Sequence, residues 1–271
     1  MNQKNPKAIK GLIISIILCF IWFEFWDWSR LWSEMGLGSG IRTSVVLTKF
    51  FVSIAMTVLL LMYKSQWRDK SDGKKLLYAF IGINLGDLAF SLSSVTHFGT
   101  GFQNTASLVG IVVFLFAQIL LLVRLFPMLK SIDWSERSNR RFGIMTAIML
   151  FVLTGFMLAT LESLQQLLEN SFPFIALLIY GIVVTASVWG AMQVQIGKIY
   201  PELNKSLIIF GMLSFLACDT TVGFNLILKA GTTPKIITES STWIFYAPAL
   251  FLLVQSVRHF TPDNKNTEQS T

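Results

Sequence analysis

The sequence predicts an all-α membrane protein, a polytopic bundle with eight transmembrane helices. Hydrophobic residues make up 53% of its 271 residues and charged residues only 14%, whereas about a quarter of the residues in a soluble domain are charged. Eight apolar segments, each about 17–25 residues long, can cross a bilayer. Lys and Arg are distributed unevenly between the connections of these segments. No stretch is left for a soluble catalytic domain, so any chemistry is expected among the membrane helices.

The expected spans share a high apolar content with few charges. They lie at about residues 9–26, 43–63, 76–96, 105–126, 142–166, 173–194, 206–228 and 242–260. We interpret residues 1–262 as one transmembrane domain and residues 263–271 as a short polar cytoplasmic tail. The first span follows three lysines but has no A-x-A-like cleavage site, which favours an uncleaved signal anchor.

Positive charge predicts the orientation in the membrane. Of the 22 Lys and Arg residues, 17 fall on the side that holds both termini, four fall on the opposite side, and Lys49 lies within a span. Because Lys and Arg accumulate in cytoplasmic connections, both termini are expected in the cytoplasm, after an even number of crossings. In a bacterium the protein would belong to the cytoplasmic membrane. Topology and anionic lipid explain the net charge of +7, so no nucleic-acid partner is expected.

The sequence shows no pattern typical of a metal, disulfide or cofactor site. Cys19 and Cys218 are the only cysteines, and both lie in apolar segments. His97 and His259 are too few for a three-histidine zinc site. The chain also lacks a G-x-S-x-G elbow, an H-E-x-x-H motif and a glycine-rich phosphate loop before a helix. We therefore expect no metal and no cofactor.

Two aspartates lie near the middle of predicted spans, Asp87 in the third and Asp219 in the seventh. An aspartate at the centre of a membrane helix costs about 2.5–3.5 kcal/mol on insertion scales, which favours a functional role over packing. The two residues are 132 positions apart in the sequence. This spacing is compatible with a duplicated four-helix unit.

The third span combines its aspartate with small and polar residues. Asn84, Asp87 and Ser91 recur on one face of a helix, and this face must meet protein or a water-filled cavity. Gly82 and Gly86 form a small-xxx-small pair, which predicts the close approach of a neighbouring helix.

Other polar residues in the spans have two open interpretations. Lys49 can extend toward the outer interface or pair with a buried carboxylate. Glu24 and Glu162 lie near outer helix ends, where a solvated position is as reasonable as a functional one. Tyr180 and Tyr246 fit an interfacial aromatic belt.

These residues fall in an order and spacing that resembles the YhhN family of membrane proteins, whose characterised members are lysoplasmalogenases. The resemblance spans about residues 43–258. It is carried by Leu85-Gly86-Asp87-Leu88 and Leu216-Ala217-Cys218-Asp219, with support from Lys49, Tyr180-Gly181-Ile182-Val183, Phe114 to Leu122 and Phe245-Tyr246-Ala247. The chain departs from the family pattern at Lys49-Phe50, where Lys-Pro is usual, and at Gln118, where the fourth helix commonly has a histidine.

The resemblance implies hydrolysis of the vinyl-ether bond of a lysoplasmalogen to a fatty aldehyde and a glycerophospho-alcohol. The partners implied are a lysophospholipid-like amphiphile and membrane lipids. One carboxyl group would protonate the vinyl ether, and a second would stabilise the resulting cation and activate water. We expect Asp87 and Asp219 to fill these two catalytic roles, in an order that the sequence leaves open. The substrate-binding candidates are Lys49, Asn84, Tyr180, Tyr246, Glu162 and Gln118.

Two other classes of function remain open. Carboxylates near mid-membrane and a possible duplication are also typical of a transporter or proton-coupled carrier. Against this class, Pro248 is the only proline well inside a predicted span. The second alternative is a lipid-binding protein that keeps the fold without catalysis, which the replacement by Gln118 favours.

Overall fold

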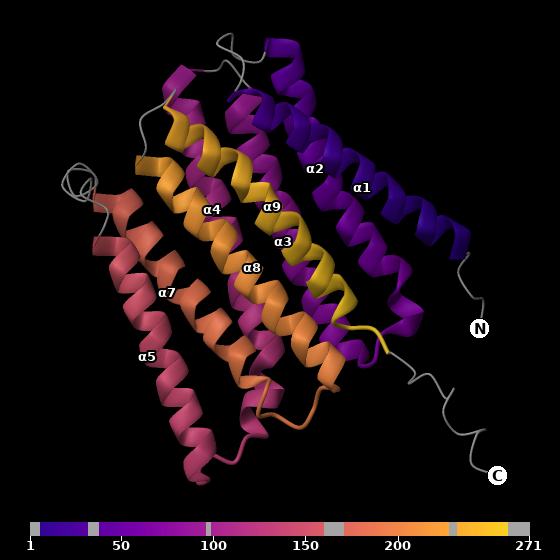
Figure 1. The fold of residues 1–271 in the computed structure, drawn as a ribbon, viewed down its shortest axis with the longest axis vertical. Coiled ribbons are helices and arrows are strands. Elements are labelled where there is room, and N and C mark those ends of the chain that lie inside the picture. Colours follow the sequence, from indigo (N-terminus) through magenta and orange to yellow (C-terminus); the bar gives the residue numbers. More distant parts are fainter. Residues whose placement is uncertain (1–5, 32–37, 96–98, 160–170, 228–231, 260–271) are drawn as a thin grey trace.

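The structure of the chain is a bundle of long helices (Figure 1). The computed structural model describes residues 6–31, 38–95, 99–159, 171–227 and 232–259. In these residues the helices are α1 (Pro6–Ser29), α2 (Ser39–Met62), α3 (Lys70–Val95), α4 (Gly99–Lys130), α5 (Arg137–Ala159), α7 (Ser171–Gln193), α8 (Glu202–Ile227) and α9 (Thr233–Gln255), with a 3-10 turn, η1, at Lys64–Gln66. The predicted all-α fold is confirmed.

Six of the described helices are long and apolar enough to cross a membrane. They are Pro6–Ser29, Gly40–Met62, Lys70–Ser94, Thr105–Lys130, Glu202–Asn225 and Thr233–Gln255. Helices α5 and α7 stand where the fifth and sixth spans were expected, and α7 contains the shorter apolar helix Leu178–Gln193. The chain is therefore a multi-pass membrane protein by the length and composition of its helices. The count of eight crossings stays a prediction.

Six of the described helices form a closed ring, and the two other described helices lie outside it. Around the ring, each helix packs against the next in the order α2, α3, α4, α7, α8, α9 and back to α2. The principal contacts of α1 are with α2 and α9, and those of α5 are with α7. Figure 1 shows α1 and α5 on opposite sides of the bundle. We call the end of the bundle where α1 ends and α9 begins the mouth end, and the opposite end the termini end.

Small residues bring α3 and α4 together, as the small-xxx-small pair predicts. A Cβ atom added at Gly82 would lie 3.2 Å from the Cβ of Ala117, and one added at Gly86 would lie 2.4 Å from a ring carbon of Phe114. Side chains at these positions would push the two helices apart, because neighbouring atoms already fill the space. The Gly86 contact also places the ring of Phe114 next to the residue that precedes Asp87 on α3.

A buried ion pair joins three helices toward the termini end. Arg124 on α4 donates two hydrogen bonds to the carboxylate of Asp72 on α3, at 2.8 and 3.0 Å, and one to Ser256 at the end of α9, at 2.9 Å. The hydroxyl of Tyr200 donates to the same carboxylate at 2.9 Å. Burial raises the pKa of the Tyr200 phenol, so this hydroxyl keeps its proton and remains a donor. Arg124, one of the 17 Lys and Arg residues assigned to the side of the termini, is thus the buried ion-pair partner of Asp72.

Candidate functional site

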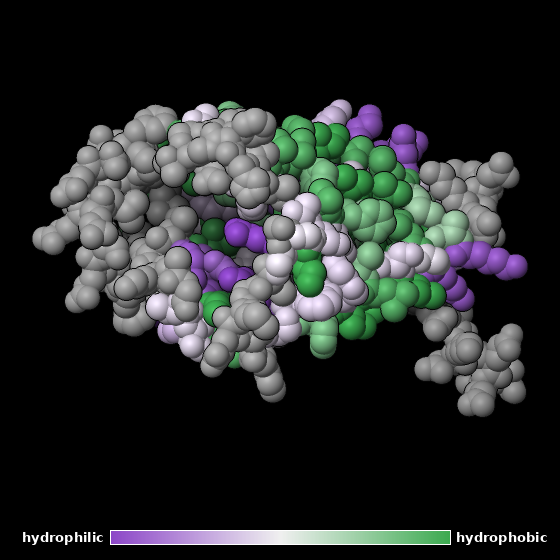
Figure 2. All heavy atoms as spheres, turned by 90° about the horizontal axis from the view of Figure 1, so that it is seen from above, coloured by the Kyte–Doolittle hydropathy of each residue, from purple (hydrophilic) through white to green (hydrophobic). Residues whose placement is uncertain are grey.

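A cavity of about 590 Å³ lies inside the helix ring and is lined by all six of its helices. This volume is in the range of small-molecule binding sites. Its wall is mostly apolar, with aromatic side chains that include Phe50, Phe90 and Phe114. The lining extends from Lys235, in the first turn of α9, to Asp87 and Tyr246 near the middle of the bundle. Figure 2 looks onto the mouth end and shows a hollow where hydrophilic side chains gather beside hydrophobic ones.

Asp87 is held in this cavity by hydroxyl groups from two other helices. Its Oδ2 accepts hydrogen bonds from Ser53 on α2 at 2.5 Å and from Tyr246 on α9 at 2.7 Å. Ser53 is fully buried and also lies 2.8 Å from the Oδ1 of Asn84, whose amide nitrogen donates to Thr57 at 2.8 Å. Asp87 is therefore fixed on one side by a hydrogen-bonded chain from α2 to α3, while the carboxyl group faces the cavity.

Asp219 faces the same cavity from α8, on the other side of the ring. Its Oδ1 accepts a hydrogen bond from the hydroxyl of Tyr180 on α7 at 3.0 Å. Its Oδ2 is buried and has no hydrogen-bond partner among the described residues. A buried carboxylate oxygen without a partner is costly unless a ligand, a water molecule or a proton serves it. The two aspartates thus share one cavity, and a tyrosine holds each of them.

A model of the YhhN family matches residues 46–257, more than half of the chain. The chain belongs to the YhhN family. The matched segment begins within α2 and includes the five other ring helices and both aspartates, while α1 precedes it. No curated protein and no solved structure matches the chain.

In this YhhN chain Lys49 does not extend to the outer interface. It pairs with a buried carboxylate, as the second interpretation of its sequence position predicted. Its ammonium group lines the cavity and bonds to Asp27, a buried residue of α1. The nitrogen also lies over the rings of Phe23 and Trp243, at 5.5 and 5.8 Å from their centroids. These contacts hold the cation inside the bundle, because an opposite charge and two aromatic faces replace its water.

Glu24 lies one turn before Asp27 on α1 and is also buried. The indole nitrogen of Trp28 donates a hydrogen bond to its Oε2 at 2.9 Å. The solvated rim position considered for Glu24 is therefore wrong, because α1 packs this face of the helix against α2 and α9. Glu162 lies outside the described residues.

Of the remaining candidates, two line the cavity and two lie behind its wall. Tyr180 and Tyr246 line the cavity as the hydrogen-bond donors of the two aspartates. Asn84 is not among the lining residues; it lies one turn from Asp87 and supports Ser53. Gln118 is fully buried on α4, where its backbone carbonyl accepts a bond from Ser187 at 3.1 Å, and it does not line the cavity either.

Ser53 and Asp27 were absent from the sequence-based candidates. Ser53 could have been found, because Lys49, Ser53 and Thr57 recur at four-residue intervals and so lie on one face of α2. Asp27 had no such signal, since the first apolar segment was expected to end at residue 26. The helix continues to Ser29, which places Asp27 inside it and turns its side chain toward Lys49.

Proposed function

We propose that this YhhN protein is a membrane-embedded hydrolase that cleaves the vinyl-ether bond of lysoplasmalogens. The products are a fatty aldehyde and a glycerophospho-alcohol. Asp87 and Asp219 act as the acid/base pair, and the substrate is a lysophospholipid-like amphiphile drawn from the surrounding lipid. The observation that carries the proposal is the pair of aspartates on one apolar cavity, each bound by a tyrosine hydroxyl.

The chemistry needs no group beyond two carboxyls and water. The protonated carboxyl gives its proton to the β-carbon of the vinyl ether, which leaves an oxocarbenium ion. The ionised carboxylate stabilises this cation and takes a proton from the attacking water, so that a hemiacetal forms. The hemiacetal then breaks its carbon–oxygen bond to the glycerol, which releases the aldehyde and the alcohol. One water molecule is consumed, and proton exchange restores the two carboxyls.

Aldehyde release from a lysoplasmalogen by the purified protein in detergent tests the proposal. We expect one aldehyde and one glycerophospho-alcohol for each lipid consumed. A saturated 1-O-alkyl lysolipid of equal chain length is the matched control, because it has no double bond to protonate. A transporter or a non-catalytic lipid-binding protein would release aldehyde from neither. Absence of aldehyde from every vinyl-ether lipid would overturn the enzyme proposal.

We further propose that the chain crosses the membrane eight times, with both termini in the cytoplasm. The charge distribution supports this, as does the alternating direction of eight helices. A cysteine at Gly38 should react with a membrane-impermeant thiol reagent added outside, and one at Ser65 should not. Both positions are exposed and lie at opposite ends of α2. Cys19 and Cys218 are replaced by alanine in the parent protein, and the reverse labelling would overturn the orientation.

The proposed duplication of a four-helix unit has support from the order of helix contacts. In each half an outer helix, α1 or α5, packs on the first ring helix of that half, α2 or α7. The next two ring helices, α3 with α4 and α8 with α9, make the most extensive contacts of the bundle. Under this scheme Asp87 and Asp219 occupy equivalent helices, α3 and α8.

A further inference from the structure

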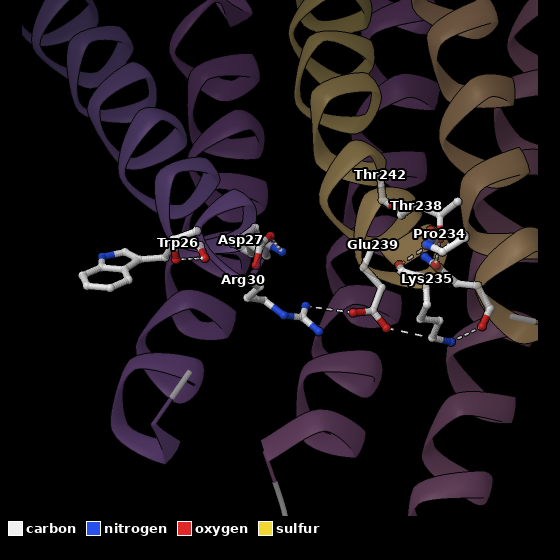
Figure 3. Close-up of polar contacts among 11 residues, drawn as sticks. Trp26, Asp27, Arg30, Pro234, Lys235, Thr238, Glu239 and Thr242 are labelled. Carbon is white, nitrogen blue, oxygen red and sulfur yellow. Dashed lines mark hydrogen bonds and ion pairs between the residues drawn. The ribbon is translucent and has the colours of Figure 1, made fainter. Parts of the chain in front are cut away.

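Three charged side chains meet beside the cavity at the mouth end, and we call them the mouth cluster: Arg30, Lys235 and Glu239. Arg30, just after α1, makes an ion pair with Glu239 on α9, with 2.8 Å between Nη1 and Oε2. Lys235, one turn earlier on α9, lies 3.8 Å from the other carboxylate oxygen. Figure 3 shows Glu239 between the two cations. The carboxylate of Glu239 thus lies within ion-pair distance of both cations.

Two members of the mouth cluster line the same cavity as the aspartates, and Arg30 joins them through its ion pair with Glu239. Lys235 and Glu239 both line the cavity, together with Asn225 at the end of α8. Lys235 bonds to the backbone carbonyl of Asn225, which holds the start of α9 against α8. Asn225 is six residues beyond Asp219, which corresponds to roughly 9 Å along a helix. If the reacting bond of a ligand lies at the aspartates, a short polar group attached to that bond is long enough to reach Lys235.

Part of the cavity wall on α3 and α4 is apolar. Phe90 on α3 and Ile111 and Phe114 on α4 line the cavity there, and the rings of Phe90 and Phe114 are 5.8 Å apart. The cavity thus has the charged residues Lys235 and Glu239 on α9, and on α3 and α4 it has an apolar surface beside Asp87 and the serines Ser91, Ser94 and Ser107. This division matches an amphiphile with one apolar chain and a charged headgroup.

The charges of the mouth cluster favour an anionic group. Arg30 and Lys235 together carry two positive charges against the single negative charge of Glu239. The distance of 3.8 Å to Glu239 is longer than a hydrogen bond, so the ammonium of Lys235 keeps donors for a further acceptor. Guanidinium and ammonium groups are the usual partners of phosphate oxygens. Lys49 also lines the cavity, but its charge is neutralised by Asp27, so it adds little to the net positive charge of the mouth cluster.

We propose that the mouth cluster is the subsite for the phosphate of a single-chain lipid headgroup. Lys235 and Arg30 bind the phosphate oxygens, and Glu239 holds the two cations in place until the ligand arrives. The hydrocarbon chain lies on the wall formed by Phe90, Ile111 and Phe114. This inference rests on the proposed function, which places the reacting bond of the lipid at the two aspartates. It deepens that function by assigning the headgroup to α9 and the end of α1.

Binding of ligands that cannot be hydrolysed tests the subsite separately from catalysis. The probes are a 1-O-alkylglycerol, the same molecule with a 3-phosphate, and the same molecule with a phosphocholine. Wild-type protein in detergent should bind both phosphate-bearing probes at least tenfold more tightly than the alkylglycerol. Lys235→Gln and Arg30→Gln should each remove most of this difference, while Lys235→Arg should keep it. Glu239→Gln should increase affinity for the alkylglycerol phosphate, because its carboxylate no longer competes for the cations.

The control variant is Arg42→Gln, an exposed cation at the same end of the bundle that, unlike Arg30, makes no ion pair with Glu239. It should leave all three affinities unchanged. Monodispersity and unchanged alkylglycerol binding show that each variant is folded. Equal affinity of wild-type protein for the three probes would overturn the subsite, as would a phosphate preference that survives in both glutamine variants. Phosphate-selective binding without aldehyde release from a lysoplasmalogen would instead support the subsite and contradict the proposed hydrolysis.

Discussion

Asp87→Asn should lower aldehyde release from a lysoplasmalogen by about 10²–10⁴-fold, the usual contribution of general acid–base catalysis, and Asp219→Asn should do the same. Asparagine keeps the shape of the side chain but can neither give up a proton nor carry a negative charge. Ser53, Tyr246 and Tyr180 can still bond to the amide, because hydroxyl groups donate and accept. The measurement is turnover by purified protein, with monodispersity checked on a sizing column.

The matched control is Asp133→Asn, an exposed aspartate in the connection between α4 and α5. Its turnover should equal that of the wild-type protein. Well-folded Asp87→Asn and Asp219→Asn variants with full activity would remove both residues from the chemistry. Loss of activity in only one variant would contradict the paired mechanism, because the reaction needs both a proton donor and a stabilising anion.

Arg124→Met should lower the free energy of unfolding by about 3–5 kcal/mol, the usual effect of breaking a buried ion pair at one partner. The change leaves the carboxylate of Asp72 buried without its counter-charge and removes the bond to Ser256. Both side chains are nearly inaccessible to solvent, with exposed fractions of 1% and 7%. Unfolding in mixed micelles of a mild and a denaturing detergent measures the effect.

The double variant Arg124→Met, Asp72→Leu separates charge from packing. It should recover much of the lost stability, since no uncompensated charge stays buried. Arg140→Met on the exposed face of α5 is the control and should stay within about 0.5 kcal/mol of the wild-type protein. An Arg124→Met variant as stable as the wild type would show that the ion pair contributes nothing to the bundle.

The sequence predicted the helices and singled out the two aspartates, because both features can be recognised from local properties. Apolar length determines a membrane helix, and an aspartate such as Asp87 is conspicuous in an apolar segment. The pair Gly82 and Gly86 likewise predicted a close contact, which the approach of α4 confirms. The sequence did not indicate which helix makes that contact.

The pairs that join distant helices could not be predicted in this way. The bond of Lys49 to Asp27 and that of Arg124 to Asp72 depend on which helices are neighbours. The helices also extend beyond their apolar segments, so that Asp27 lies in α1 and not in the connection that follows it. A charge near the end of an apolar segment looks the same in sequence whether it faces water or a buried partner.

Because α1 lies outside the ring, the proposed site is built from two parts of the fold, the ring helices and one outer helix. The ring helices hold the carboxyl pair, whereas α1 supplies Asp27 and precedes Arg30, which set the charge around Lys49 and Lys235. The principal contacts of α1 are with α2 and α9, and not with α3 and α8, which carry the two aspartates. Under the proposed function, the headgroup subsite therefore draws one of its two cations from outside the ring, whereas both carboxyls lie on ring helices.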